Sequence, residues 1–560
     1  MGKSEVVTGA DRLVEALVTL GVDVVFGLPG VHNLSIWEAI AETDIRLVGV
    51  RHEQTAAYAA DGYARATGKL GVALVTTGPG AANTVTATGE AWTVGSPIMI
   101  IATDIPTTIR RPDVFRGVLH ECRDQAAMFG PVVKHARTCE SADGVGADVL
   151  QVAAIALGGS PGPVYLGVPI DTLTGAALSA LPPTTFEATS RKGRRLSVNA
   201  DDRAGAVAIL KSAPRPLIWA GGGSIASGAS AAVQALAERL DAPVLTTYGG
   251  KGILPSSHPL VVNASVLVKD VEALWDQADV VIAIGTDFDA MMTRGWGLKQ
   301  PAELLVINID ADDASKNYTP TLILEGDART ILEDLLSDVD QRDGNQFVVD
   351  ELRAIEDKVW SQIRAESPDA ADMLDTLHHV LPADGILVVD MCVAGYWSGG
   401  FHRVSGPRKF AYPVGWGTLG FGFPASLGSA AANVGPVVAL VGDGGFLYAC
   451  GDLATMAQEQ LPVTLVIVDD GGYGMLRFGQ THAGLETRGV DLLTPDFDMM
   501  VRAFGLPVTT MVGFGRPFAD ALAAGIASGK PNVIVVKAKM MPPPTTSVRW
   551  VPAVERVSRG

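Results

Sequence analysis

The stretch VVALVGDGGFLYACGDLATMAQEQLPVTLVIVDDGGYGM, residues 437–475, decides the fold of this chain. Its two apolar runs, 437–441 and 463–468, lack the polar alternation that is typical of a half-exposed strand. Between them we expect a helical segment from the glycine turn to about Gln460. A strand, a helix and a second strand of this kind form a βαβ unit of a parallel sheet that is covered on both faces.

Both loops of this unit combine aspartate with glycine at the carboxyl end of a strand, where ligands bind in such sheets. The loop residues are Gly442, Asp443, Gly444, Gly445, Asp470, Gly472 and Tyr473. Glycines let backbone N–H groups approach phosphate oxygens, and two carboxylates can hold a hard cation such as Mg2+. The loops therefore predict a metal and phosphate site, with ordinary turn aspartates as the alternative.

The composition is that of a large α/β enzyme. A length of 560 residues corresponds to about three domains, and 48% apolar residues with 63 glycines indicate large cores and tight turns. The net charge of −18 argues against nonspecific binding to nucleic acid or to an anionic membrane. Four cysteines without metal-site spacing favour a reducing cytoplasm, and the absence of a long apolar segment favours a soluble protein.

The alternation of strands and helices predicts three doubly wound α/β domains with mainly parallel sheets. We expect them at residues 1–180, 195–345 and 365–560, with a linker rich in Pro, Thr and Ser at 181–195 and a charged helical stretch at 327–366. The central segment is Rossmann-like, but its glycines after 216–220 lack the complete G-x-G-x-x-G spacing. Packing turns are therefore the favoured interpretation of these glycines.

Four motifs, in this order along nearly the whole chain, give the sequence a family resemblance. They are Arg51-His52-Glu53 before an alanine-rich helix, Thr77-Gly78-Pro79-Gly80, Gly417-Thr418-Leu419-Gly420, and Gly442-Asp443-Gly444 with Asp470 behind it. Together they resemble the thiamine-diphosphate-dependent enzymes of the acetolactate synthase and pyruvate oxidase group. The resemblance implies an N-terminal pyrimidine-binding domain, a central domain and a C-terminal diphosphate- and Mg2+-binding domain. It also implies a homodimer or homotetramer with active sites between subunits.

The resemblance assigns roles to the loop residues of the opening stretch. Asp443 and Asp470 would bind Mg2+ through their side chains, and Gly472 would bind it through its carbonyl. Gly444 and Gly445 would lie against the diphosphate, with Gly442 and Tyr473 as neighbouring cofactor contacts. The family usually has asparagine at the position of Asp470, and aspartate offers the same oxygen ligand with a different charge.

Three further residues would contact the cofactor ring. Glu53, from the partner subunit, would exchange a proton with the aminopyrimidine, a task that suits a carboxyl group with a pKa raised by burial. Its alternative role is to stabilise a helix N-terminus. Gly417 would offer its carbonyl to the exocyclic amine, and Leu419 would be the apolar wedge that bends the cofactor, where ordinary core packing is the alternative.

The motifs do not assign the residues that determine substrate specificity, and four residues are candidates. His32 follows the first strand and can transfer protons near neutral pH. His120 lies in the tripeptide Leu119-His120-Glu121, at a place where biosynthetic acetolactate synthases have a sequence similar to Phe-Gln-Glu. This difference argues against strict acetolactate synthesis. The surroundings of both histidines resemble 2-oxo acid decarboxylases of arginine catabolism, which act on 5-guanidino-2-oxopentanoate. Gln480 and Glu486, in a polar loop after Tyr473, are possible substrate contacts near the entrance.

The implied function is Mg2+- and thiamine-diphosphate-dependent cleavage or formation of a C–C bond next to a carbonyl. Decarboxylation of a 2-oxo acid, with carboligation as a further outcome, is the first interpretation. A 2-hydroxyacyl-CoA or benzaldehyde-type lyase is one alternative, and a noncatalytic cofactor-binding regulatory subunit is another. The central domain would bind FAD, ADP or nothing, because Gly285-Thr286-Asp287-Phe288 and Asp310 are compatible with a nucleotide without requiring one.

Overall fold

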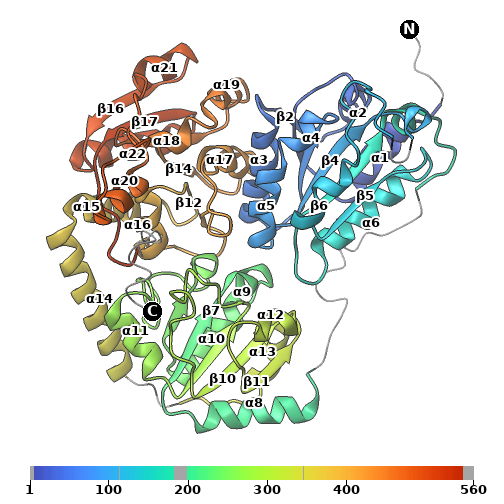
Figure 1. Cartoon of the computed structure of the whole chain (residues 1–560). Coiled ribbons are helices and arrows are strands. Elements are labelled where there is room, and N and C mark those ends of the chain that lie inside the picture. The colour runs from blue at the N-terminus through green and yellow to red at the C-terminus, as the bar shows by residue number, and fades with distance from the viewer. Residues whose placement is uncertain (1–5, 112–113, 182–197, 343, 345, 547–560) are drawn as a thin grey trace. The chain divides into compact units, whose positions relative to one another are not determined.

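The computed structural model of this protein describes residues 6–111, 114–181, 198–342, 344 and 346–546. It contains three sheets, in the N-terminal, central and C-terminal parts of the chain, with helices between the strands (Figure 1). The predicted linker at 181–195 lies, beyond its first residue, outside the described residues. Among the helices of the described part, none is both long and apolar enough to cross a membrane.

The first sheet has the strand order β2-β1-β3-β4-β6-β5, and its paired strands run parallel. Its strands are β1 (Val24–Gly27), β2 (Arg46–Gly49), β3 (Gly71–Val75), β4 (Ile98–Asp104), β5 (His135–Thr138) and β6 (Val164–Pro169). In a doubly wound sheet of this order the strand sequence reverses between β1 and β3, and ligands bind beside such a switch point at the carboxyl ends of the strands.

Helices cover both faces of this sheet (Figure 1). They are α1 (Gly9–Thr19), α2 (Leu34–Ile40) and α6 (Val145–Leu157) on one face, and α3 (Glu53–Thr67) and α5 (Val85–Thr93) on the other. Val72 and Leu74 of β3 belong to the core under the first group, whereas Ala73 between them is buried without belonging to it. Coverage of both faces explains why the inner strands β1 and β3 are apolar at every position, whereas the edge strands β2 and β5 contain arginine.

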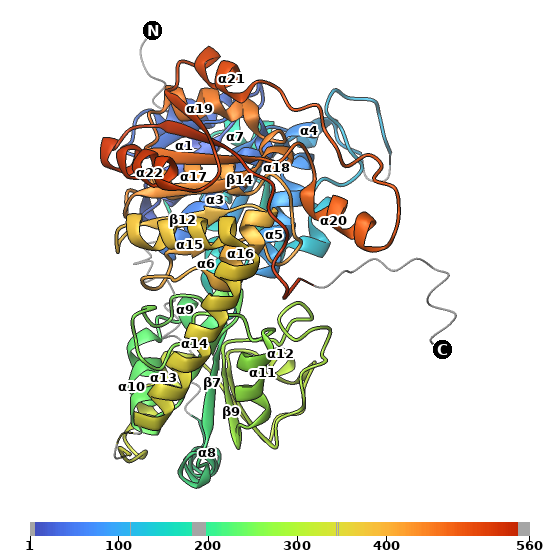
Figure 2. The same ribbon diagram turned by 90° about the vertical axis from the view of Figure 1, so that its left-hand side faces the viewer.

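The central sheet has the order β11-β10-β9-β7-β8 and is also parallel in its described pairs. Its strands are β7 (Pro216–Ala220), β8 (Val244–Thr246), β9 (Val280–Ile284), β10 (Glu303–Asn308) and β11 (Leu322–Glu325). Figure 2 shows α10 (Ser230–Leu240) and α13 (Ala328–Leu336) on one side of it, and α11 (Lys269–Asp276) and α12 (Ala311–Ser315) on the other.

The glycines after β7 are explained by close packing of two turns. The N–H of Gly223 donates to the carbonyl of Gly285 at 2.9 Å. A Cβ added at Gly221 would collide with the same carbonyl, and one at Gly223 would lie 2.8 Å from the Gly285 Cα. These contacts agree with the interpretation of the glycines as packing turns.

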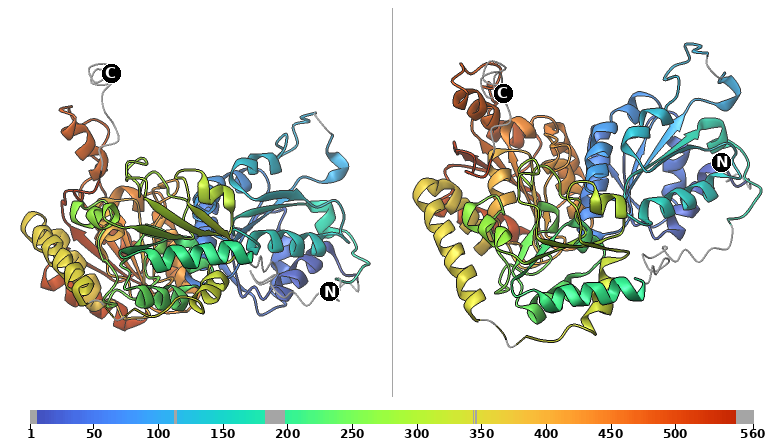
Figure 3. Two further views of the ribbon diagram at one scale, coloured as in Figure 1. Left: turned by 90° about the horizontal axis from the view of Figure 1, so that it is seen from below. Right: turned by 60° about the horizontal axis from the view of Figure 1, so that its bottom comes forward.

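The third sheet repeats the topology of the first. Its order β13-β12-β14-β15-β17-β16 becomes 2-1-3-4-6-5 when its strands are counted from its own first strand, as in the first sheet. Its strands are β12 (Ile386–Val389), β13 (Phe410–Ala411), β14 (Val437–Gly442), β15 (Val463–Asp469), β16 (Val508–Val512) and β17 (Asn532–Lys537). The charged stretch at 327–366 forms two helices, α13 and the 21-residue α14 (Gln346–Glu366), which is one continuous helix in both views of Figure 3.

The prediction of one helix from the glycine turn to Gln460 is wrong. The chain instead forms α18 (Asp443–Phe446), a 3-10 turn at Cys450–Asp452 and α19 (Leu453–Gln458). Gly451 lies in the interruption, and glycine weakens a helix interior. The carboxylate of Asp452 binds groups outside the segment, among them the N–H of Arg51 at 2.8 Å. These contacts hold the turn apart from a regular helix.

The chain forms two compact units, which are described separately below. The first contains residues 1–193, 413–437 and 449–463, and the second contains 194–412, 438–448 and 464–560. In the first unit α3 packs along α17 (Gly422–Ala431), and a Cβ at Gly62 or at Gly428 would collide with a backbone carbonyl of the facing helix. Glycine at these two positions therefore permits the close approach of the helices.

Candidate active site

Glu53 is the first residue of α3, and its side chain is buried in the first unit. Only 9% of the residue is exposed, and its Oε2 accepts a hydrogen bond from Asn83 Nδ2 at 2.9 Å. A Cβ at Gly80 would lie 3.4 Å from Glu53 Oε1. The loop Thr77-Gly78-Pro79-Gly80, called the TGPG loop below, therefore approaches the carboxyl group through the backbone of Gly80. The structure therefore brings two of the predicted motifs together around one buried carboxyl group.

A second buried carboxylate, which the sequence analysis missed, fixes the backbone around Glu53. Asp452 is 1% exposed, and its Oδ1 accepts from the Arg51 N–H at 2.8 Å while its Oδ2 accepts from the Thr55 hydroxyl at 2.6 Å. The Thr455 hydroxyl donates to Oδ1 at 2.8 Å. The available signal in the sequence was a charged residue in an otherwise apolar segment. Its partners are about 400 positions away and could not be identified from a local pattern.

The loop that carries Gly417 is held by Glu90 of α5, another residue that the sequence analysis missed. Glu90 is fully buried and accepts from the N–H groups of Gly415 at 3.4 Å and Trp416 at 3.1 Å, and from the Thr418 hydroxyl at 3.4 Å. Gly417 itself has φ +66°, a left-handed conformation that favours glycine. The carbonyl that the resemblance assigns to the cofactor therefore belongs to a tightly tethered turn.

Glu90 is part of a buried charge triad on α3 and α5. Arg65 makes two hydrogen bonds to Asp61, at 2.6 and 2.9 Å, and its Nη2 lies 3.6 Å from Glu90 Oε1. Burial raises the pKa of Glu90, and the Arg65 charge acts against this rise.

Leu419, the predicted wedge, lies half-buried two residues after Gly417.

The structure brings the two predicted histidines together. The rings of His32 and His120 are 5.6 Å apart and meet edge to face. His32 Nδ1 lies 2.7 Å from the Thr77 hydroxyl, which in turn donates to Thr103 at 2.9 Å. Burial lowers the pKa of His32 below its ordinary 6.5, and the neighbouring His120 lowers it further. His32 is therefore a neutral imidazole at pH 7 that can accept a proton.

Gln125 fixes the TGPG loop and was also missed. Its Oε1 accepts from the Gly78 N–H at 2.6 Å, and its Nε2 donates to the Thr103 carbonyl at 2.8 Å and to the Tyr165 hydroxyl at 2.7 Å. Gly78 has φ +66°, and a Cβ there would lie 2.7 Å from the His120 carbonyl. His120 also has a positive φ, 67°. A positive φ is unfavourable for a residue other than glycine, so the surrounding structure must hold it. Residues in such conformations are common at functional sites.

In the second unit, Asp443 joins the two loops of the opening stretch. It is 1% exposed, and its Oδ2 accepts from the N–H groups of Gly471 at 2.8 Å and Gly472 at 2.9 Å. Asp470 Oδ1 accepts from the same Gly472 N–H at 3.1 Å. Both predicted metal-binding carboxylates therefore converge on one backbone segment, and Gly472 adopts φ +148° there.

The electrostatics of this pair suit a divalent cation. Burial, followed by the charge of Asp470, raises the pKa of Asp443 to about 6. Burial also raises the pKa of Asp470, against the opposing effect of Arg477. No cluster of three or more His, Cys, Asp or Glu side chains with metal-binding geometry occurs in the described part of the chain. Two carboxylates and a carbonyl fit Mg2+, which typically keeps waters and binds substrate phosphates as its other ligands.

Small residues keep the backbone of these loops accessible at close range. A Cβ at Gly444 would lie 2.7 Å from the Tyr473 ring, and one at Gly442 would lie 2.9 Å from the Cys392 Cβ. Gly445, the remaining predicted phosphate contact, is buried in α18. Because α18 has only four residues, its dipole is short, and backbone N–H groups are the main feature that can bind phosphate there.

Gln480 lies on α20 (Gly474–His482), and its amide is engaged within its own loop. It accepts from the Arg488 N–H at 2.9 Å and donates to the Arg488 carbonyl at 3.1 Å. Glu486 is exposed and pairs with the Arg488 side chain at 2.9 Å. These contacts give Gln480 a structural role in the loop, whereas a substrate contact stays a prediction.

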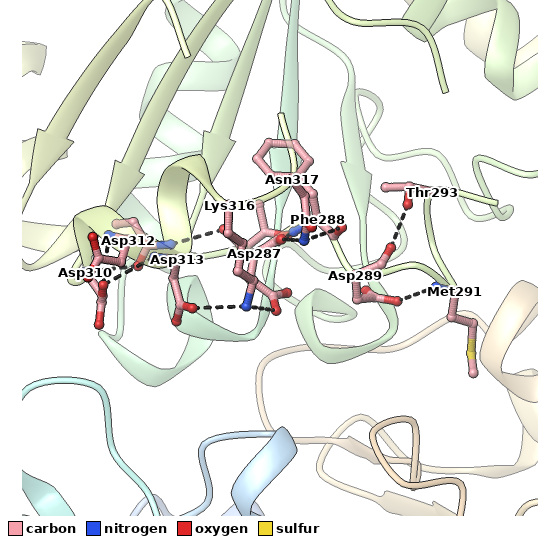
Figure 4. A network of polar contacts seen from close by, with 12 residues as sticks. Asp287, Phe288, Asp289, Met291, Thr293, Asp310, Asp312, Asp313, Lys316 and Asn317 are labelled. Atoms are coloured by element: carbon pink, nitrogen blue, oxygen red, sulfur yellow. Dashed lines mark hydrogen bonds and ion pairs between the residues drawn. The ribbon is translucent and has the colours of Figure 1, made fainter. Parts of the chain in front are cut away.

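The acidic edge of the central sheet is occupied by its own side chains (Figure 4). Lys316 bridges Asp287 at 2.8 Å and Asp313 at 2.9 Å. Asp310, which follows β10, caps α12 by accepting from the N–H groups of Asp312 and Asp313 at 2.9 and 3.2 Å. The polar residues that are compatible with a nucleotide are thus explained by contacts within the domain.

Comparisons with known proteins agree with this geometry. Three family models match the chain: "Thiamine pyrophosphate enzyme, N-terminal TPP binding domain" at residues 7–128, the central domain of the same enzymes at 204–335, and their C-terminal TPP binding domain at 390–536. A probable 2-ketoarginine decarboxylase, AruI, of Pseudomonas aeruginosa is 35% identical over 91% of this chain and 90% of the relative.

Two further relatives are named as acetolactate synthases. A probable acetolactate synthase large subunit of Methanocaldococcus jannaschii is 31% identical, over 95% of this chain and 93% of the relative. The acetolactate synthase isozyme 3 large subunit of Escherichia coli is 30% identical, over 90% and 89%. The matches extend through all three sheets and include both candidate cofactor loops. The chain therefore belongs to the thiamine pyrophosphate enzyme family.

Proposed function

We propose that this enzyme decarboxylates a 2-oxo acid with thiamine diphosphate and Mg2+. As a further outcome, it joins the decarboxylated product to a second carbonyl compound. The observation that carries the proposal is the buried carboxyl group of Glu53, the first residue of α3. It accepts a hydrogen bond from Asn83 and lies in the segment that matches the thiamine pyrophosphate-binding domain. The relatives named as 2-ketoarginine decarboxylase and acetolactate synthase support the same class of reaction.

When bound, thiamine diphosphate supplies a nucleophilic carbon that adds to the substrate carbonyl and accepts electrons as the adjacent C–C bond breaks. Glu53 would exchange a proton with the aminopyrimidine ring. The Gly417 carbonyl would accept a hydrogen bond from the ring amine, and Leu419 would supply an apolar surface that orients the ring. The tether between Glu90 and the turn at Gly415 and Trp416 supports this orientation.

The loops of the C-terminal sheet bind the other end of the cofactor. Asp443 and Asp470 would hold Mg2+ through their carboxylates, and Gly472 would do so through its carbonyl. The buried, mutually repelling carboxylates support this assignment, because a cation offsets their charge. The remaining predicted contacts with the diphosphate are Gly442, Gly444, Gly445 and Tyr473.

His32 and His120 transfer protons to and from the substrate. Their edge-to-face pairing at 5.6 Å and the lowered pKa of His32 support a neutral imidazole base at this position. The first substrate to test is 5-guanidino-2-oxopentanoate, because the 35% identical relative is named as a 2-ketoarginine decarboxylase. Pyruvate is the second, from the relatives named as acetolactate synthases.

The proposal extends to assembly, location and domain roles. We assign pyrimidine binding to residues 1–180, the central domain to 195–345, and diphosphate and Mg2+ binding to 365–560. The active form is a homodimer or homotetramer in which Glu53 serves the cofactor of a partner subunit, which light scattering tests. The four free cysteines support a reducing cytoplasm. Visible absorption of the purified protein distinguishes bound FAD in the central domain from ADP or no nucleotide.

Product analysis tests the reaction directly. The enzyme is incubated with thiamine diphosphate, Mg2+ and one of three substrates: 5-guanidino-2-oxopentanoate, pyruvate or a 2-hydroxyacyl-CoA. Release of carbon dioxide from either 2-oxo acid is expected, with loss of turnover in Glu53→Gln. C–C bond cleavage of the 2-hydroxyacyl-CoA alone would establish the lyase alternative instead, and unchanged turnover in Glu53→Gln would remove the proposed mechanism. Lack of activity with intact cofactor binding would favour the regulatory-subunit alternative.

A further inference from the structure

A single buried carboxylate holds both sides of the backbone that carries Glu53. Asp452 binds the N–H of Arg51, two residues before Glu53, at 2.8 Å, and the hydroxyl of Thr55, two residues after it, at 2.6 Å. Glu53 lies between these contacts, and its own carboxyl group is bonded to Asn83 instead. Asp452 can therefore set the position of Glu53 without touching it.

The anchor of Asp452 is itself fixed. Its Oδ1 also accepts from the Thr455 hydroxyl at 2.8 Å, and Thr455 is fully buried in α19. The same Thr455 hydroxyl lies 3.1 Å from the carbonyl of Gly49, at the end of β2. The turn before α19 is thus bonded through Asp452 to Arg51, in the loop between β2 and α3, and to Thr55, in the first turn of α3. A displacement of Asp452 would move the first turn of α3, where Glu53 lies.

We infer that Asp452 is a positioning residue for the proton transfer by Glu53. This inference rests on the proposed function, because it requires Glu53 to exchange a proton with the cofactor. Asp452 acts through two hydrogen bonds that fix the residues flanking Glu53, and its negative charge is not required for the effect. Burial raises the pKa of Asp452, and the hydrogen bonds from Thr55 and Arg51 act against this rise.

Two pairs of substitutions distinguish a positioning role of Asp452 from a role of its charge. In Asp452→Asn, the amide oxygen can accept from the N–H of Arg51 and from the Thr455 hydroxyl, and the amide N–H can donate to the Thr55 oxygen, since a hydroxyl also accepts. The flanking contacts are retained while the charge is lost. Asp452→Ala removes both the contacts and the charge. Thr55→Val and Thr55→Ser form a second matched pair, because only serine retains the hydroxyl.

The measurement is hydrogen–deuterium exchange at the reactive carbon of thiamine diphosphate in the holoenzyme. This exchange reports the proton removal that Glu53 promotes and requires no substrate. It is measured together with the half-saturating cofactor concentration and the thermal midpoint. We expect Asp452→Ala and Thr55→Val to slow exchange by about 10- to 100-fold, the effect of misplacing a catalytic group by about 1 Å. Cofactor affinity should change far less, and Asp452→Asn and Thr55→Ser should stay close to the wild type.

Asp148→Ala is the control for a general loss of stability. Asp148 is another buried carboxylate of the first unit, 5% exposed and paired with Arg137 at 2.7 Å, and it contacts none of the residues around Glu53 described above. It should lower the thermal midpoint without slowing exchange in the protein that remains folded. If Asp452→Ala fails to fold, the Thr55 pair decides the question.

Three results would overturn the inference. The first is wild-type exchange in Asp452→Ala or Thr55→Val, and the second is an Asp452→Asn variant as slow as Asp452→Ala, which would assign the effect to charge. The third is a loss of cofactor affinity that accounts for the whole effect. Glu53→Gln separates these results from a failure of the proposed function. If Glu53→Gln exchanges as fast as the wild type, the role of Glu53 is wrong, and the inference falls with it.

Discussion

Replacing Asp443 by asparagine should stabilise the cofactor-free protein and destabilise the loaded one. Burial and Asp470 raise the pKa of Asp443 from 3.8 to about 6. A carboxyl group whose pKa is raised by folding stabilises the protein at low pH, and this contribution is lost as the pH rises from about 4 through 6. At pH 7.5 the ionised side chain therefore lowers the free energy of unfolding by up to about 3 kcal/mol, at about 1.4 kcal/mol per pKa unit.

Asparagine removes this cost but not every hydrogen bond. Its oxygen can still accept from the N–H groups of Gly471 and Gly472, whereas its NH2 group faces the N–H of Gly444, which now donates to Oδ1 of the aspartate at 2.7 Å. Losing that bond costs about 1 kcal/mol. The net gain at pH 7.5 is about 1–2 kcal/mol, which corresponds to a rise in the thermal midpoint of about 2–8 °C.

Thermal unfolding at pH 5 and pH 7.5, with a chelator or with Mg2+ and thiamine diphosphate, tests this balance. Without the cation, the variant should be the more stable protein at pH 7.5, and the advantage should become smaller at pH 5, where most of the folded Asp443 is protonated. With saturating ligands the wild type should gain about 3 kcal/mol at 100 times the dissociation constant, and the variant much less. Asp327→Asn, which exchanges one cap of α13 for another, is the control.

The reasoning fails if cofactor-free Asp443→Asn is less stable than the wild type at pH 7.5. It also fails if the difference between the two proteins is the same at both pH values. An equal gain from Mg2+ and cofactor in both proteins would show that Asp443 does not hold the cation.

Other substitutions give separate tests. Gly62→Ala should lower the free energy of unfolding by about 1–3 kcal/mol, because its Cβ would collide with the carbonyl of Ala425; denaturation unchanged from the wild type would contradict the close packing of α3 and α17. Glu90→Leu should cost about 3 kcal/mol, since it leaves Arg65 buried with one carboxylate fewer. Glu90→Gln also lacks the charge but keeps an oxygen for the N–H groups of Gly415 and Trp416, so it should cost less; equal stability of the two variants would argue against a role of these hydrogen bonds. The acid limb of kcat/KM should lie below pH 6.5 and disappear in His32→Gln, and a limb that persists there would belong to another group.

The sequence predicted the parallel sheets well because their strands are covered on both faces. The runs at 437–441 and 463–468 are apolar except at Thr464 and correspond to β14 and β15. Two edge strands of the third sheet were missed for the opposite reason. β13 has only two residues, and three of the five positions of β16 are exposed, so neither has a clear apolar pattern.

The residues that hold the site together could not be predicted. Glu53 and Asp443 were identified by motifs, in which the neighbours along the chain carry the signal. Asp452 and Glu90 instead bind backbone groups 401 and 325 positions away. A local pattern contains no information about such partners, and a buried carboxylate is not distinguished from an exposed one by its immediate neighbours. The broken helix at 443–458 has the same origin, because the turn at Asp452 is fixed by residues near the other end of the chain.

The shared strand order of the first and third sheets bears on the ancestry of the chain. Two sheets that both run 2-1-3-4-6-5 are the expected product of a duplicated gene segment whose copies have diverged. The copies retained the strand order and changed the loops at the strand ends. One copy carries the glutamate at the start of α3, and the other carries the paired aspartates after β14 and β15. A single early domain that paired with itself would have presented identical loops on both sides of its ligand. In a chain that contains two such sheets, a substitution in the loops of one leaves the loops of the other unchanged.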